Sequence, residues 1–208
     1  MKGLLLKDWY MMKKYCRMYI LITVIFLGVS IVNTENLFIV FYPCVLCGMI
    51  PVTLLGYDER SHWLLYSCTL PYSRKQVVSA KYLIGLCTQV AVLLLTAATQ
   101  AVAMSVNGTF AIGDFLILIF AMLFVSAFAS SISLPFIFRY GVEKGRLAYY
   151  VMIGFVCAAS FLASNLLGDR SFAASNSVLI YLLLGVFGLG IYALSWYFSV
   201  TFYQKREL

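Results

Sequence analysis

The chain has 208 residues, of which 63% are hydrophobic and only 11% are charged, and its formal net charge is +7. A soluble domain of this length has no core large enough for that much apolar surface, so the composition predicts an integral membrane protein. The basic residues alternate with long uncharged blocks. This pattern indicates membrane topology and excludes a nucleic-acid-binding surface as the reason for the positive charge.

Lysine and arginine fall almost entirely in four short stretches. Fourteen of the fifteen lie at the N-terminus (Lys2, Lys7, Lys13, Lys14, Arg17), in residues 58–81 (Arg60, Arg74, Lys75, Lys81), in residues 139–146 (Arg139, Lys144, Arg146) and in the tail (Lys205, Arg206). Each of the three apolar blocks between these stretches is interrupted by a loop that holds Glu35, Asp114, or Asp169 with Arg170. Because a Lys or Arg at the centre of a membrane helix costs roughly 2.5–3.5 kcal/mol, the basic stretches are expected to stay in the cytoplasm. The pattern predicts six spans with both termini cytoplasmic.

The fold class predicted is an all-α integral membrane protein that forms a single transmembrane domain over residues 1–208. A helix needs about 20 apolar residues to cross the hydrocarbon core. Six segments qualify: 18–33, 37–56, 82–106, 114–138, 147–167 and 177–203. Membrane strands are excluded, because each apolar block is too long and shows no alternation of apolar and polar residues.

Residues 1–17 are predicted to form an amphipathic helix that lies on the membrane surface. Its apolar positions recur at steps of four and three: Leu5, Trp9, Met12, Cys16 and Tyr19. Lys7, Lys13, Lys14 and Arg17 lie on the other side, where they would meet anionic lipid headgroups. The alternative is a positively charged anchor with no helix of its own.

The loop over residues 57–81 is the most specific stretch. Asp58 and Glu59 lie where a short helix would begin, Trp63 and Tyr66 give it large contact side chains, and Pro71 would follow its end. Ser73 and Gln76 have the spacing of a capping box, which predicts that the next helix begins there. A protruding helix with exposed aromatic residues is typical of a docking surface. The alternative is that its aromatic residues lie in the headgroup layer.

Uncharged polar residues follow one stripe of the third span. Gln89, Thr96 and Gln100 lie on it, together with Gly85 and Asn107. They either bond to neighbouring helices or line a translocation path. In the fourth span, Ser126, Ser130, Ser131 and Ser133 precede Pro135, which removes a backbone donor; hydroxyl groups nearby can satisfy the freed carbonyl.

Residue types that carry catalysis or metal binding are scarce. The six cysteines (Cys16, Cys44, Cys47, Cys68, Cys87, Cys157) are expected to pack as small apolar residues, and the single C-x-x-C has no second ligand pair. His62 has no metalloprotease motif around it, and the chain has no G-x-x-x-x-G-K-[ST] phosphate loop. We therefore expect no enzymatic activity, no metal and no cofactor in this chain, and any energy for transport must come from a partner.

Three stretches, MKGLLLKDW, DERSHWLLYSCTLPYSRKQVVSAKY and LPFIFRYGVEKGR, resemble the small type-2 ABC exporter permeases of Gram-positive bacteria. That group includes the membrane subunits of phenol-soluble-modulin exporters. The best motifs are Asp58-Glu59, Leu70-Pro71-x-Ser73-Arg74-Lys75 with Lys81-Tyr82, and Gly141 with Glu143-Lys144-Gly145-Arg146. The resemblance spans the whole chain.

This resemblance implies a permease that works with two ABC ATPase subunits and a second permease, identical or homologous. Residues 58–70 would be the coupling helix on the ATPase, and residues 139–146 would face the same subunit. The ATPase-contacting residues would be Asp58, Glu59, Arg60, Trp63, Tyr66, Pro71, Ser73, Arg74 and Lys75, with Gly141, Glu143, Lys144 and Arg146 in the second loop. ATP and magnesium would bind the partner, and the cargo would be an amphipathic or hydrophobic peptide. The rival prediction is a membrane sensor or scaffold that transports nothing.

Overall fold

The computed structural model describes residues 2–32, 37–67, 69, 71–108, 111–151, 154 and 177–205. This part of the chain is 93% helical and has no strand. Its helices are α1 (Lys2–Tyr15), α2 (Arg17–Val32), α3 (Leu37–Arg60), α4 (Trp63–Ser67), α5 (Arg74–Val106), α6 (Ile112–Tyr140) and α8 (Ser177–Lys205). Residues 142–151 are also helical and follow α6 directly.

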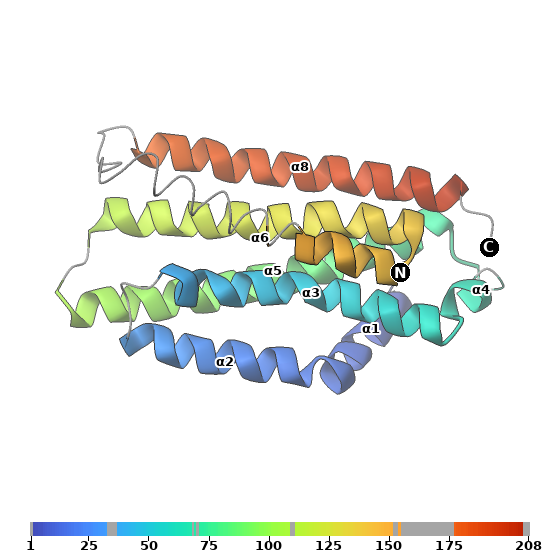
Figure 1. Ribbon diagram of the computed structural model, residues 1–208, viewed down its shortest axis with the longest axis horizontal. Coiled ribbons are helices and arrows are strands. Elements are labelled where there is room, and N and C mark those ends of the chain that lie inside the picture. Colours follow the sequence, from blue (N-terminus) through green and yellow to red (C-terminus); the bar gives the residue numbers. More distant parts are fainter. Residues whose placement is uncertain are drawn as a thin grey trace.

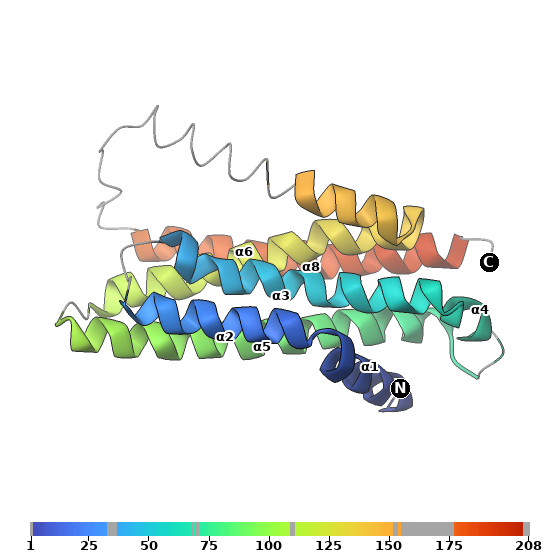
Figure 2. The ribbon, with the colours of Figure 1, turned by 60° about the horizontal axis from the view of Figure 1, so that its bottom comes forward.

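The long helices lie side by side along the longest axis of the molecule (Figure 1). α6 packs along α8, and α3 packs against α2, α5 and α6. α1 turns away from α2 by 67° and lies across one end of the bundle (Figure 2). The same end carries α4, the start of α5 and the last turns of α3, α6 and α8, and we call it the charged end.

In the part of the chain that the structure describes, four helices are long and apolar enough to cross a membrane: Ile39–Arg60, Arg74–Val106, Ile112–Tyr140 and Val178–Lys205. The bent pair of α1 and α2 would raise the number of candidate spans to five. The expected first span, 18–33, corresponds to α2, which has only 16 residues. The expected fifth span, 147–167, lies mostly outside the described residues, so the six-span arrangement stays a prediction.

The boundaries of the long helices follow local sequence signals. Ser73 has an extended backbone, its hydroxyl accepts from the Gln76 N–H at 3.3 Å, and the Gln76 side chain accepts from the Ser73 N–H at 3.1 Å. The predicted capping box is thus confirmed, and α5 runs without a break from there through the third predicted span, 82–106. Asp114 lies in the first turn of α6, where its negative charge interacts favourably with the positive end of the helix dipole.

Pro135 lies inside α6 and cannot donate to the carbonyl of Ser131, four residues earlier. The Ser195 hydroxyl on α8 donates to that oxygen at 2.7 Å. The hydroxyls of Ser131 and Ser133 bond to carbonyls of α6 itself. The freed carbonyl is therefore satisfied by a hydroxyl, as expected, but from a neighbouring helix and not from the serines that precede the proline.

The main apolar cluster lies toward the charged end and draws on α1, α3, α5, α6, α8 and the helix over residues 142–151. Its members include Leu4, Val52, Val78, Leu134, Ile137, Val142 and Tyr203. Gly145 allows the helix over 142–151 to approach α6, because a Cβ at Gly145 would overlap the side chain of Ile137. The two cytoplasmic loops predicted from the sequence are thus anchored in one packed region.

α1 is amphipathic, but its buried stripe differs from the one expected. Leu4, Asp8 and Met12 are buried at successive steps of four residues, whereas Trp9 is 45% exposed. The apolar stripe read from the sequence omitted position 8, because an aspartate is not expected to face a protein interior. α1 instead buries Asp8 against a lysine of α5, and this pairing fixes which face points inward.

Candidate functional site at the charged end

The segment predicted as one helix over residues 58–70 is divided in the structure. Asp58 and Glu59 lie in the last turn of α3 and not in the first turn of a short helix. His62 has a φ of 51°, in the left-handed region, and this turn separates α3 from the five-residue α4. The carboxylates therefore face the negative end of a helix dipole, and cations nearby must offset that cost.

Asp58 belongs to a closed ring of four charged side chains. Lys81 Nζ lies 2.6 Å from Asp8 Oδ1 and 2.6 Å from Asp58 Oδ2. Lys7 Nζ lies 2.7 Å from Asp58 Oδ1 and 3.5 Å from Asp8 Oδ1. The Asp8, Asp58 and Lys81 side chains are at most 3% exposed. This ion ring has no net charge and joins α1, α3 and α5.

Lys7 also connects the ion ring to α4. Its ammonium lies 4.0 Å from the centre of the Trp63 ring, a cation–π contact. Desolvation and the nearby Lys81 lower the pKa of Lys7, and the pairing with Asp58 opposes that shift. Trp63 is half-buried against the main apolar cluster, whereas Leu65 and Tyr66 are 52% and 58% exposed. The outward side chains of α4 are therefore Leu65 and Tyr66.

The residues that follow α4 differ in their environment. Pro71 and Ser73 are exposed, and Ser73 is occupied as the helix cap. Arg74 donates to the backbone carbonyls of Tyr203 and Gln204 at 3.4 and 3.0 Å, so it ties the start of α5 to the end of α8. Lys75 lies over the Trp196 ring at 5.4 Å.

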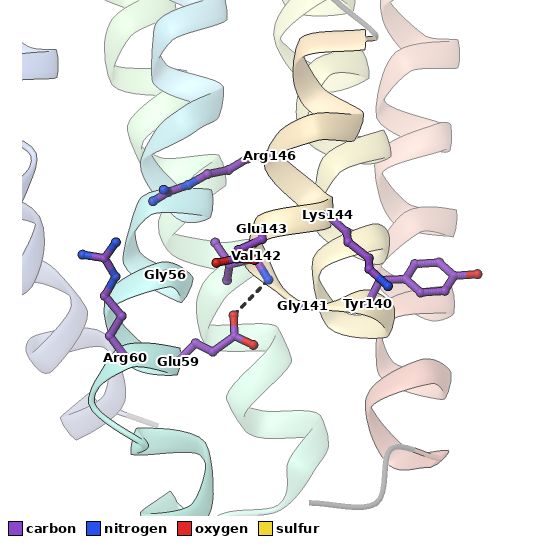
Figure 3. Close-up of a pocket in the computed structure, with 9 residues that line it drawn as sticks. All are labelled: Gly56, Glu59, Arg60, Tyr140, Gly141, Val142, Glu143, Lys144 and Arg146. Atoms are coloured by element: carbon purple, nitrogen blue, oxygen red, sulfur yellow. Dashed lines mark hydrogen bonds between the residues drawn. The ribbon is translucent and has the colours of Figure 1, made fainter.

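The second loop contacts the end of α3 through Glu59. Its Oε2 accepts a hydrogen bond from the Val142 N–H at 2.9 Å, which satisfies a free donor at the start of the helix over residues 142–151 (Figure 3). Gly141 has a φ of 90°, a backbone conformation that favours glycine, and a Cβ there would lie 3.1 Å from Glu59 Oε1. Glu59 thus bridges the two predicted cytoplasmic loops.

A pocket of about 310 Å³ lies beside this contact. Arg60, Glu143, Lys144 and Arg146 line it, and Arg60 and Arg146 extend toward the side that carries Gly56 (Figure 3). A Cβ at Gly56 would lie 3.0 Å from the Arg146 guanidinium, so the glycine makes room for that group. The structure brings the second-loop residues together with Glu59 and Arg60, while Asp58 lies apart in the ion ring.

The polar stripe of α5 is buried between helices in this conformation. Gln89, Thr96 and Gln100 are 8%, 1% and 2% exposed. The Gln89 amide donates to the Ser126 carbonyl at 2.9 Å and to the Ser130 hydroxyl, and Thr96 bonds to carbonyls of its own helix. These contacts support interhelical bonding for Gln89; a role in a path stays a prediction.

Cysteine positions give no sign of a shared site among the residues described. Cys16, Cys44 and Cys47 are buried free thiols and Cys87 is exposed, whereas Cys68 and Cys157 lie outside the described residues. No group of three metal-ligating side chains lies close together within the part of the chain that the structure covers.

A bundle of apolar helices with short charged connections at one end defines a multi-pass membrane protein. The sequence-family model of the ABC-2 family transporter proteins matches residues 3–204, so the chain belongs to that family. Comparison with curated proteins and with solved structures gave no significant match. Family membership makes the chain a membrane permease component of an ABC transporter, a class that is generally not catalytic itself and that implies an ATPase partner.

Sequence reasoning overlooked three residues of the charged end. Asp8 was assigned no role, and Lys81 was treated only as a topology signal and as part of a motif. Leu65 lacked the aromatic ring that drew attention to Trp63 and Tyr66. A weak signal existed for Lys81, because it directly precedes the predicted span 82–106; Asp8 lies in the middle of the predicted N-terminal helix and gave no such signal.

Proposed function

We propose that this chain is the membrane-spanning permease subunit of an ATP-driven exporter, and that α4 with its flanking residues 57–81 contacts a separate ATP-binding subunit. The observation that carries the proposal is the family match over residues 3–204. ATP and magnesium then bind the partner subunit, and two ATPases work with two permeases.

The geometry of the charged end supports α4 as the coupling element. Its outward side chains, Leu65 and Tyr66, are apolar or aromatic and exposed, as in the centre of a protein interface. Its inward side chain, Trp63, packs on Lys7 of the ion ring. A displacement of α4 by the ATP-binding subunit is therefore transmitted to α1, α3 and α5 together, since the ion ring joins all three helices.

The proposed topology has six spans, with both termini and the charged end in the cytoplasm. The start of α1 and the end of α8 lie at the same end of the bundle as α4, as an even number of spans requires (Figure 1). The resemblance to phenol-soluble-modulin exporters supports an amphipathic or hydrophobic peptide as the cargo. The second candidate function, a scaffold without transport, is favoured by the same exposed docking helix.

The test combines the permease with candidate ABC ATPase subunits of the source genome. We expect Tyr66→Ala to weaken ATPase binding by about 2 kcal/mol, roughly thirtyfold, because a large aromatic side chain at an interface centre is lost. The measurements are the affinity of the purified subunits and ATP-dependent peptide uptake into inverted vesicles. Trp63→Ala should change binding and stability together, because its ring is packed inside the protein.

Tyr10→Ala is the matched control, since Tyr10 is 63% exposed on α1 at the charged end but lies outside α4. Its binding should equal that of the unmodified protein. Unchanged affinity in both Tyr66→Ala and Leu65→Ala would contradict the docking proposal. ATPase binding without any ATP-dependent uptake would favour the scaffold.

A further inference from the structure

A second pocket, of about 500 Å³, lies between α6 and α8 toward the charged end. Ser131, Pro135 and Arg139 line it from α6, and Ser195, Phe198 and Phe202 line it from α8. Positions 131, 135 and 139 follow one another at steps of one helical turn, so this wall extends for about 12 Å. Such a volume falls in the range of sites for small ligands.

The polar atoms of Ser131 and Ser195 are already occupied. The Ser195 hydroxyl donates to the Ser131 carbonyl at 2.7 Å, and the Ser131 hydroxyl donates to the Ala127 carbonyl at 2.6 Å. Pro135 adds no backbone donor. A peptide in the pocket would bring backbone N–H and C=O groups that are costly to bury without partners, whereas a hydrocarbon chain needs none. The apolar part of the pocket therefore fits an acyl chain better than a peptide backbone.

Among the described residues, Arg139 is the single charged residue that lines this pocket. Its guanidinium lies 5.0 Å from the ring centres of both Tyr140 and Phe202, so two aromatic side chains hold it in place. Within the described residues it has no ion-pair partner. A guanidinium offers paired donors that match the oxygens of a phosphate.

We propose that this pocket binds an anionic phospholipid, with one acyl chain between α6 and α8 and the phosphate on Arg139. The charge of Arg139 favours a lipid with net negative charge over a zwitterionic one. The site holds lipid whether or not an ATPase is bound, so it goes beyond the proposed function and does not depend on the choice of cargo.

The experiment reconstitutes the full chain in nanodiscs with equal amounts of phosphatidylglycerol and phosphatidylcholine. After mild detergent extraction, mass spectrometry measures how much of each lipid stays with the protein. The unmodified protein should retain phosphatidylglycerol preferentially. Arg139→Gln should reduce this preference roughly tenfold, as expected for the loss of a charge-assisted hydrogen bond. Arg60→Gln, an arginine outside this pocket, is the matched control and should retain the preference.

Two further variants keep the test decisive if Arg139→Gln does not fold. Arg139→Lys keeps the charge but loses the paired donors, and should lie between the unmodified protein and Arg139→Gln. Leu194→Trp fills the pocket from α8 and should release the lipid without changing the charge.

Three results would overturn the proposal. One is an unchanged lipid preference in the pocket variants. Another is equal thermal stabilisation by inorganic phosphate and by phosphatidylglycerol, which would mean a phosphate site without a chain. The third is displacement of the lipid by one equivalent of an amphipathic peptide, which would assign the pocket to cargo.

Discussion

Asp8 Oδ1 and Lys81 Nζ lie 2.6 Å apart although 73 positions separate them, and their side chains are only 1% and 3% exposed. An isolated buried charge is strongly unfavourable, so neither residue would be tolerated in this position without the other. The ion ring with Lys7 and Asp58 balances both charges. α1 is thereby fixed to the two helices that flank α4.

Lys81→Met should destabilise the protein by about 3–5 kcal/mol, because it leaves two buried aspartates with one lysine. The protein is kept in a mild detergent and unfolded with increasing concentrations of a denaturing detergent, and the measurement is the midpoint of this transition. Adding Asp8→Leu should recover much of the loss, since the remaining pair of Lys7 and Asp58 is neutral. Lys144→Met, at an exposed lysine, is the control; an equally large effect there would show that the ion ring has no special role.

Gly145→Ala should destabilise the protein by about 1–3 kcal/mol, because the new Cβ would overlap Ile137 and separate the second loop from α6. The loss should be smaller in an Ile137→Ala background, where the overlapping atoms are absent. Gly28→Ala, where a Cβ would meet nothing within 4 Å, serves as the control. If Gly145→Ala lowers the free energy of unfolding equally in the unmodified protein and in the Ile137→Ala background, the overlap with Ile137 is not the cause.

The sequence was sufficient to predict the long helices. The expected segments 114–138 and 177–203 correspond to Ile112–Tyr140 and Ser177–Lys205, because apolar length and flanking charge locate a membrane helix closely. The start of α5 could be predicted from Ser73 and Gln76, since a capping box acts through neighbours along the chain. Local signals of this kind are visible without any knowledge of tertiary structure.

The charged end was less predictable, because its contacts join residues far apart in the sequence. From the sequence, Asp58 could lie either in the first turn of a short helix that contains Trp63 or in the last turn of the preceding span. Only the pairing of Asp58 with Lys7 and Lys81 decides between these two positions. The packing of Trp63 on Lys7 is equally invisible, since it depends on the 67° bend between α1 and α2. Which side chains of α4 are exposed therefore depends on tertiary contacts that the sequence does not reveal.

Cysteine labelling tests the proposed topology. In a background without the native cysteines, a membrane-impermeant thiol reagent added from outside should modify Asn36→Cys and leave Ser73→Cys unmodified. The reason is that the basic residues around position 73 favour the cytoplasm, whereas the loop at position 36 has no Lys or Arg. Permeabilised cells, in which both positions should react, provide the control. The opposite labelling pattern would overturn the six-span topology.

The bond from Ser195 to the Ser131 carbonyl gives the sharpest test of packing between α6 and α8. Ser195→Ala should cost about 1–3 kcal/mol, because it leaves a buried carbonyl without a donor. The same hydroxyl lies 2.7 Å from the Tyr82 hydroxyl, which also bonds to Ser199, so Tyr82 keeps a partner in the variant. Most of the loss should therefore come from the carbonyl.

Pro135→Ala restores the backbone N–H that normally bonds to this oxygen in a helix, and in that background Ser195→Ala should cost clearly less. The four proteins of this double-mutant cycle are compared by their unfolding midpoints in detergent. Additive effects of the two substitutions would mean that Ser195 does not replace the donor that Pro135 removes.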